Sequence, residues 1–313
     1  MLLLDGGSTS IAKFLSLPAP RIPEPLSKLW TSAHSLTSPE AVLAWHTSFL
    51  EAGADVISTN TYQIPLVENA PEVDVPRLMR SGVSIAVAAI SEHGRGSIVL
   101  SLGSRNAGYG KGEYGTEAQA TVKEYKIFHE RRIKEYRSAI GDLWNKIEYF
   151  AFETVSSYEE AEGILSMLSE EAMTKCKKSW VTFSCGDASK SRMQNIFSRL
   201  LKLPEISTLW GVGFNCIGYD IALELAEMLA DIIKDTTLIL VVYADAGRWD
   251  DKTTAQFSYD SPRMDEKYVE HWAETMMKIA ELNCGRTLIG GCCNTDSRFI
   301  SALALLRKAK SES

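Results

Sequence analysis

The chain of 313 residues contains no long apolar run and no extended basic stretch. A helix that crosses a membrane needs about 18 or more consecutive apolar residues, and no segment approaches that length, so we expect no membrane contact. The formal net charge is −7, and the longest cationic cluster, at 175–178, is brief. We therefore expect neither nucleic acid nor an anionic membrane surface as a partner.

Cysteine is also scarce. Six cysteines in a chain of this length are too few for a disulfide scaffold. The first four residues are apolar but are followed at once by Asp5, so they have neither the basic start nor the apolar length of a signal peptide. We expect a reducing, intracellular location, the cytoplasm, where clustered cysteines indicate a metal site or catalysis.

Short apolar runs recur along the chain, and each ends at small or polar residues. They are too short for helices and read as strands that are buried on both faces. These runs lie at 2–4, 55–58, 97–102, 149–152, 180–183, 211–214, 238–242 and 287–289.

Helical patterns separate these runs, at 39–52, 75–92, 117–140, 157–170, 188–201, 221–233, 265–282 and 297–308. Ser38 and Pro39 suit a helix start, and Ser157 followed by Glu160 is typical of a capping box. Eight strand–helix alternations without a linker predict one (β/α)₈ TIM barrel that spans residues 1–313. An open, doubly wound sheet is the alternative. The long loops 16–38 and 103–116 would be lids at the catalytic face.

Two adjacent cysteines, Cys292 and Cys293, follow Gly290 and Gly291 at the end of the eighth predicted strand. Alone they could be small buried hydrophobes. In a barrel, however, Cys216 at the end of the sixth strand would reach the same mouth, because the active site lies at the C-terminal ends of the strands.

Three cysteine ligands and one open position fit a catalytic zinc site, so we predict Zn²⁺ as the cofactor, held by Cys216, Cys292 and Cys293. Electron-rich thiolate ligands favour alkyl transfer onto a bound thiol over activation of water. The glycines would let the backbone approach the metal closely. Cys176 and Cys284 lie in helical contexts and are expected to be inert. Cys185 ends the fifth strand, where packing is favoured over a ligand role.

Several motifs resemble the homocysteine S-methyltransferase family, and together they run from residue 4 to residue 295. They are Leu4-Asp5-Gly6-Gly7, Thr59-Asn60-Thr61-Tyr62-Gln63, Gly112-Glu113-Tyr114, Phe152-Glu153-Thr154, Gly213-Phe214-Asn215-Cys216 and Gly290-Gly291-Cys292-Cys293-Asn294-Thr295. The resemblance implies zinc-dependent transfer of a methyl group from S-methylmethionine or S-adenosylmethionine to homocysteine, which forms methionine. The implied partners are these small molecules.

The resemblance also implies roles for single residues. Asp5 and Glu153 would grip the amino group of homocysteine, and Asn215 would belong to the substrate-binding set. A buried acid at a barrel mouth is costly without a cationic partner, which supports this assignment. Tyr62 and Tyr114, with Trp30 as a further candidate, would form an aromatic wall for a sulfonium donor through cation–π attraction. Ordinary loop packing is the alternative for these rings.

The chain departs from the family pattern after Gly7, after Cys216, after Thr295 and at 243–247. These departures keep two alternatives open: the same chemistry on another thiol, or a zinc-binding barrel that has lost catalysis. Only 301–313 follow the last motif and its continuation through residue 300, whereas betaine-using relatives carry a longer C-terminal arm for oligomer contacts. We therefore predict that S-methylmethionine is the best donor, that betaine is inactive, and that the protein is a monomer.

Overall fold

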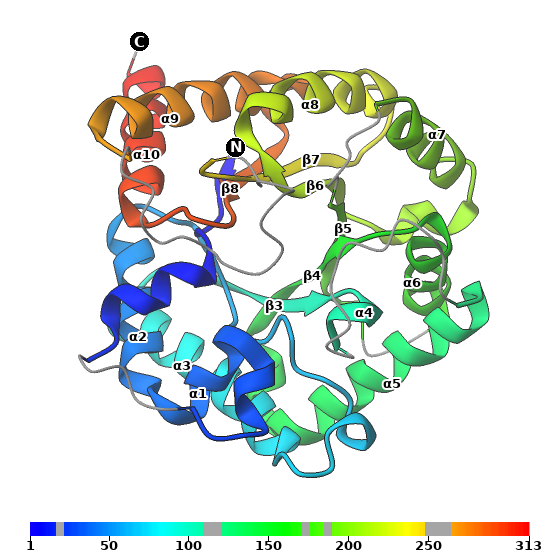
Figure 1. The fold of residues 1–313 in the computed structure, drawn as a ribbon. Coiled ribbons are helices and arrows are strands. Elements are labelled where there is room, and N and C mark those ends of the chain that lie inside the picture. The colour runs from blue at the N-terminus through cyan, green and yellow to red at the C-terminus, as the bar shows by residue number, and fades with distance from the viewer. Residues whose placement is uncertain are drawn as a thin grey trace.

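Eight parallel strands form a closed barrel in the computed structural model (Figure 1), which describes residues 1–16, 22–108, 120–170, 174, 176–184, 190–247 and 264–312. The strand order is β1-β8-β7-β6-β5-β4-β3-β2. A parallel bridge between Leu4 and Val56 joins β1 to β2, and the Asp5 amide donates to the Val56 carbonyl at 3.1 Å. The predicted barrel is therefore confirmed, and the open sheet is wrong.

The strands coincide with the predicted apolar runs. Their side chains are buried on both faces, because one face fills the barrel and the other packs under the helices. The strands are β1 Leu2–Leu3, β2 Val56–Ser58, β3 Ser97–Gly103, β4 Ile147–Val155, β5 Lys178–Phe183, β6 Gly211–Gly218, β7 Ile239–Asp245 and β8 Thr287–Gly291.

The α-helices form a ring around the barrel (Figure 1). They are α1 His34–Thr37, α2 Pro39–Glu51, α3 Val75–His93, α4 Arg105–Gly108, α5 Val122–Ile140, α6 Tyr158–Glu170, α7 Lys190–Leu200, α8 Tyr219–Ile233, α9 Glu266–Glu281 and α10 Ser297–Ser311. Short 3₁₀ segments are η1 Ser8–Phe14, η2 Leu26–Ala33, η3 Val67–Asn69, η4 Gly141–Lys146, η5 Pro204–Thr208 and η6 Asn283–Gly285. Among the described residues, no helix has the length and apolar character needed to cross a membrane.

One predicted helix start differs from the structure in an informative way. Ser157 does accept a hydrogen bond from the Glu160 amide at 3.2 Å. The Glu160 carboxylate, however, does not complete a capping box; it accepts from the Arg105 amide at 2.6 Å and contacts His129. The fold has therefore directed this acid into the interior between α5 and α6.

The helix α5 begins with a capping box that the sequence reasoning missed, formed by Thr121 and Glu124. The Glu124 carboxylate accepts from the Thr121 amide at 2.7 Å. The start predicted at residue 117 lies outside the described residues. At α2, Ser38 is the N-cap residue as expected, but its hydroxyl makes no capping bond, so Pro39 is the main start signal there.

The barrel interior is filled by side chains in its lower layers and becomes polar at its C-terminal end. The apolar layers are Leu4, Val56, Val99, Tyr149, Ala151, Trp180, Ile239, Val241, Tyr243 and Leu288. Gly213 allows close strand contact, since a Cβ there would lie 1.6 Å from the Val241 carbonyl oxygen. At the C-terminal end of these layers the Tyr243 and Thr182 hydroxyls are 2.7 Å apart. Because the interior below is filled, a ligand can reach polar side chains of the barrel only at its C-terminal mouth.

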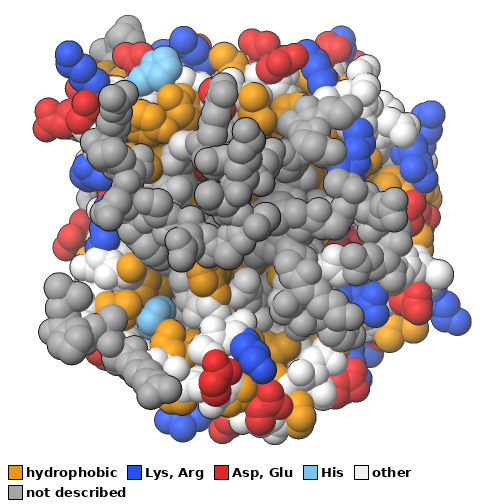
Figure 2. Space-filling model, viewed as in Figure 1, with side chains coloured by type: hydrophobic (Ala, Val, Ile, Leu, Met, Phe, Trp, Pro, Cys, Tyr) orange, Lys and Arg blue, Asp and Glu red, His pale blue; other side chains and the backbone are white. Residues whose placement is uncertain are grey.

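The exposed face in Figure 2 carries Lys and Arg side chains interspersed with Asp and Glu around its described rim. Ion pairs also join neighbouring helices; for example, Lys126 on α5 pairs with Glu170 on α6. Mixed charge of this kind is typical of a solvated surface.

Candidate functional site

A cavity lies at the C-terminal mouth of the barrel, and residues from seven strand ends or the loops after them line it. Almost every residue singled out from the sequence is in this lining. It includes Asp5, Trp30, Ser58, Tyr62, Ser101, Glu153, Thr154, Asn215, Cys216, Tyr243, Cys292 and Cys293. Two residues considered from the sequence, Tyr114 and Cys185, lie outside the described residues.

The three cysteines meet at one side of this cavity. The sulfurs of Cys216 and Cys292 are 3.0 Å apart. Together with a carboxylate oxygen of Asp245, the three sulfurs all lie within 4.8 Å of one another. Cys176 and Cys284 are exposed and do not line the cavity.

Asp245 is a site residue that the sequence reasoning missed, since it was noted only as part of a departure from the family pattern. It ends β7, is 2% exposed, and accepts a hydrogen bond from the Cys293 amide at 2.9 Å. Alternation along β7 places it on the same face as Val241 and Tyr243, which fill the barrel. That alternation was the sequence signal that could have identified it.

The backbone at Cys216 is bent to aim its sulfur. The ladder between β6 and β7 shifts register between Asn215 and Gly218, and Cys216 has a φ of 51°. A non-glycine residue in the left-handed region is uncommon and costs free energy, of the order of 1–3 kcal/mol. Such irregularities are frequent next to active sites, where they redirect a side chain.

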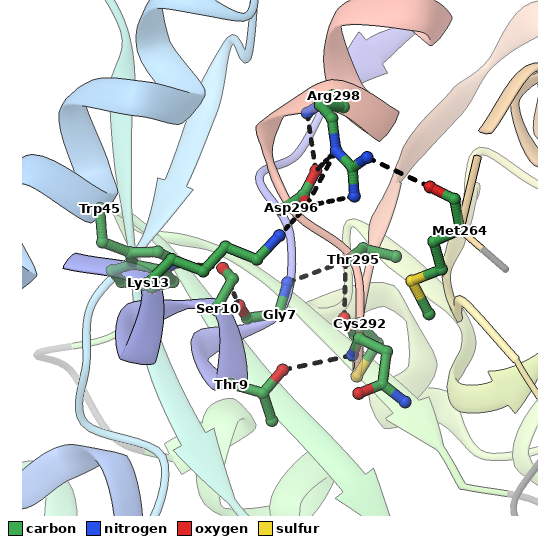
Figure 3. A network of polar contacts seen from close by, with 11 residues as sticks. Gly7, Thr9, Ser10, Lys13, Trp45, Met264, Cys292, Thr295, Asp296 and Arg298 are labelled. Carbon is green, nitrogen blue, oxygen red and sulfur yellow. Dashed lines mark hydrogen bonds and ion pairs between the residues drawn. The ribbon is translucent and has the colours of Figure 1, made fainter. Parts of the chain in front are cut away.

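The cysteine loop is tied to the N-terminal segment, as Figure 3 shows. The Thr295 hydroxyl accepts from the Gly7 amide at 2.9 Å and donates to the Cys292 carbonyl at 2.6 Å. A Cβ on Gly291 would lie 2.3 Å from that hydroxyl, and a Cβ on Gly7 would lie 2.1 Å from the Cys292 carbonyl oxygen. Gly291 therefore permits a close approach to Thr295.

Two departures from the family pattern meet beside this loop. Asp296 caps α10 and forms ion pairs with both Lys13 and Arg298 (Figure 3). Burial by itself would raise the pKa of Asp296, but the hydrogen bonds from Arg298 and Lys13 outweigh it and lower the pKa. Arg298 also donates to the Met264 carbonyl at 3.2 Å. The unusual residues after Gly7 and after Thr295 thus form one ion cluster outside the cavity lining.

Two carboxylates lie in the cavity. Asp5 accepts from the Ser58 amide at 2.7 Å and from its hydroxyl at 2.8 Å, and Glu153 accepts from the Ser101 hydroxyl. Burial raises the pKa of Asp5 to about 8, and the charge of Glu153 adds to this effect. No Lys or Arg occurs among the described lining residues. The cavity therefore favours a cationic group in contact with these acids.

The Asn215 amide is engaged with the end of β4. Its oxygen accepts from the Thr154 amide at 2.8 Å, and its nitrogen donates to the Thr154 hydroxyl at 2.8 Å. Thr154 has a φ of 59° and directly follows Glu153. Asn215 lines the cavity, and in this geometry it fixes the backbone beside Glu153.

Aromatic residues form another part of the wall, where Tyr62 and Trp30 line the cavity. Trp30 has φ 46° and ψ −131° at a kink within η2. This conformation is strained for a bulky residue, so the surrounding contacts must hold it. The next residue is held by the Asn60 side chain, which donates to the carbonyl of Thr31 at 2.8 Å.

Packing three thiols together makes their ionisation uneven. Hydrogen bonds from Cys216 and Cys293 lower the pKa of Cys292 well below its usual range. The same contact with Cys292 holds the pKa of Cys216 well above its usual range. Because thiolates packed this closely repel one another, a bound cation would be needed to ionise all three.

The family model described as homocysteine S-methyltransferase matches residues 2–306. The chain belongs to the homocysteine S-methyltransferase family. Its members are transferases of the methyltransferase class, and so is this one. It is 28% identical over 307 residues to homocysteine S-methyltransferase 1 of Zea mays, which covers 90% of this chain and 88% of the relative. It is also 28% identical over 292 residues to the betaine-homocysteine S-methyltransferase of Drosophila melanogaster, a match that covers 85% of this chain and 82% of the relative.

Among solved structures, the chain is similar to the homocysteine methyltransferase MmuM from Escherichia coli in its metallated form. The TM-score is 0.71 with 22% sequence identity, and the match covers 98% of this chain and 96% of MmuM. At that identity the likeness supports the barrel fold of this family member.

Proposed function

We propose that this homocysteine S-methyltransferase family member transfers a methyl group from a sulfonium donor to the thiol of homocysteine. The transfer would use a Zn²⁺ ion held by Cys216, Cys292 and Cys293. The observation that carries the proposal is the meeting of three sulfurs and two carboxylates in one cavity. Homocysteine has a thiol for the first group and an ammonium for the second.

The donor set suits zinc. A tetrahedral ion with Zn–S bonds of about 2.3 Å holds its sulfurs roughly 3.7–3.8 Å apart. The four candidate donor atoms span a similar range, from 3.0 Å between two sulfurs to within 4.8 Å overall. Thiolates also prefer this metal to magnesium or calcium. When bound, the ion would lower the pKa of the substrate thiol so that the sulfur is nucleophilic at neutral pH.

The residues of the chain supply orientation. Asp5 and Glu153 bind the substrate ammonium, and the arriving positive charge lowers the pKa of Asp5 from its raised value, which favours the ionised form of Asp5 in the complex. Holding the amine at one end of the cavity and the sulfur at the other leaves the sulfur a single approach to the methyl carbon. Positioning of this kind provides much of the rate in a displacement reaction.

The methyl donor would lie against Tyr62 and Trp30. A sulfonium cation is attracted to an aromatic face, typically by about 0.5–2 kcal/mol. We propose a sulfonium donor, with S-methylmethionine preferred, because a neutral thioether leaves more readily than the tertiary amine that betaine would release. Betaine is expected to be inactive, although overall similarity does not separate the donors: the plant and fly relatives are equally identical to this chain.

The test is methionine formation by the zinc-loaded protein with homocysteine and, in turn, S-methylmethionine, S-adenosylmethionine and betaine. We expect the first donor to be used fastest. Turnover with betaine alone would refute the donor assignment. No methionine with any donor, from protein that still binds zinc, would favour a non-catalytic barrel, and activity only with another thiol would favour a different acceptor.

A further inference from the structure

Three buried charged or titratable residues lie behind the cavity and play no part in the proposed chemistry. Arg132 and His129 are on α5 and Glu160 is on α6, and each is at most 1% exposed. Arg132 Nη2 lies 3.0 Å from His129 Nδ1, and His129 Nε2 lies 3.0 Å from Glu160 Oε1. They form one continuous chain of hydrogen bonds.

The chemistry of these groups fixes the direction of each bond. A guanidinium can only donate, so His129 Nδ1 accepts, and the ring proton on Nε2 is donated to the Glu160 carboxylate. The imidazole is therefore neutral, in accord with burial lowering the pKa of His129 to about 4. Burial also lowers the pKa of Arg132, to about 10, which leaves it charged at neutral pH. The hydrogen bonds thus join the buried guanidinium of Arg132 to the buried carboxylate of Glu160 through the neutral ring of His129.

Arg132 and Glu160, the two ends of this hydrogen-bond network, both hold the backbone at the end of β3. Arg132 Nη1 donates to the Gly103 carbonyl at 2.7 Å, and Glu160 accepts from the Arg105 amide at 2.6 Å. These bonds satisfy a carbonyl and an amide where the strand leaves the barrel. They also fix the direction in which the chain continues into α4.

The held segment supports two cavity residues. Gly103 pairs in register with Glu153 on β4. The Gly103 amide donates to the Tyr62 carbonyl at 3.2 Å, and a Cβ on Gly103 would lie 2.8 Å from Tyr62 Cε2. A shift of Gly103 would therefore disturb both the acid and the aromatic wall.

Burying an arginine to bond one carbonyl costs considerable desolvation free energy, because a full charge loses its hydration. Its cost is offset where the charge also acts on nearby acids. Glu160 is one such acid through His129, and the charge of Glu153 is felt at Arg132 as well. The Glu153 carboxylate, in a cavity whose described lining holds no Lys or Arg, thus has a fixed cation behind the wall.

We propose that Arg132 is a positioning residue for recognition of the substrate amino group: by holding Gly103 and placing a fixed charge behind Glu153, it keeps that carboxylate aligned on the ammonium. This inference rests on the proposed function, since it assumes an amine in contact with Glu153. It assigns Arg132 no contact with substrate or metal. It therefore predicts a loss confined to the amine end of the ligand.

The experiment compares two ligands on zinc-loaded protein by calorimetry. Homocysteine carries the amine; 4-mercaptobutanoate has the same thiol and carboxylate without it. In the wild type we expect homocysteine to bind at least about tenfold more tightly, as the loss of a charge-assisted hydrogen bond predicts. Arg132→Met keeps an unbranched side chain as far as the position of Nε but removes the charge and both terminal nitrogens. In this variant the affinity for homocysteine should fall by about tenfold, while the affinity for 4-mercaptobutanoate and the zinc content should be unchanged.

Arg132→Lys keeps the charge but loses the planar fork, so its preference for homocysteine should be intermediate. If Arg132→Met does not fold, Arg132→Lys must still reduce the preference. Arg137→Met is the matched control, because Arg137 is on the same helix but stacks over Trp144, 5.4 Å from the ring centre. It should change neither affinity.

The outcomes separate the two proposals. If the Arg132 variants keep the wild-type preference for homocysteine, or weaken both ligands equally, the positioning role is refuted and the proposed function is untouched. If the wild type itself does not distinguish the two ligands, amine recognition by Asp5 and Glu153 fails.

Discussion

Two fully buried histidines should make the protein sensitive to mild acid, and His46 provides the sharper test. Its side chain is 0% exposed on α2, beside the ring of Trp45 at 4.4 Å between centroids. Neither ring nitrogen has a hydrogen-bond partner in the described part of the chain. Burial lowers the pKa of His46 from 6.5 to about 3, and burial likewise lowers the pKa of His129 to about 4.

The sign follows from proton linkage. Each folded pKa lies below the unfolded value, so the unfolded chain binds more protons between the two values, and stability is present above about pH 6.5 and lost as the pH falls below it. A pH of about 5 is roughly 1.5 units below the pKa of a histidine in the unfolded chain. Protonation of the unfolded chain then lowers the free energy of unfolding by about 2 kcal/mol for each histidine. Two such histidines together lower the free energy of unfolding by about 4 kcal/mol, which is a large part of the total of about 5–15 kcal/mol that is typical of a folded protein.

The measurement is urea unfolding of wild type and His46→Leu at about pH 7 and about pH 5. The variant should be at least as stable at the higher pH, because it removes two buried polar atoms that lack partners. It should lose about 2 kcal/mol less than wild type on acidification. Any release of bound metal in acid would affect both proteins, so the difference between them isolates His46. Equal losses in the two proteins would refute the reasoning.

Three further predictions concern the site and the barrel. Alanine at any cavity cysteine should abolish metal retention, measured as zinc per chain, whereas the exposed Cys284→Ala should keep it; the cavity cysteines are Cys216, Cys292 and Cys293. Asp5→Asn and Glu153→Gln should each weaken homocysteine binding by roughly 10- to 100-fold in calorimetry, as loss of a charge-assisted bond predicts, with zinc still bound; unchanged affinity in both would argue against amine recognition. Gly213→Ala should destabilise the protein by more than about 3 kcal/mol, since its new methyl group would lie 1.6 Å from the Val241 carbonyl oxygen; a normal denaturation midpoint would contradict the strand spacing.

The sequence by itself determined the barrel. Its strands are buried on both faces, so each appears as an apolar run that a local reading detects, and each helix repeats an amphipathic pattern between them. The same logic located Cys216 and Cys292 at strand ends, and strand ends of a barrel converge. The family motifs then suggested the amine-binding roles that we propose for Asp5 and Glu153, which local patterns do not encode.

Only the tertiary structure decided which further residues join the site and how each acid is used. Asp245 is beside the sulfurs because β7 lies between β6 and β8, a relation between strands that no local pattern contains. Glu160 looked like a helix cap, yet it is bonded to His129 across two helices. A flexible acid such as Glu160 can form a hydrogen bond with its own helix or with a distant residue, and each such bond is worth only about 1 kcal/mol. The choice therefore depends on neighbours that come from segments far apart in sequence.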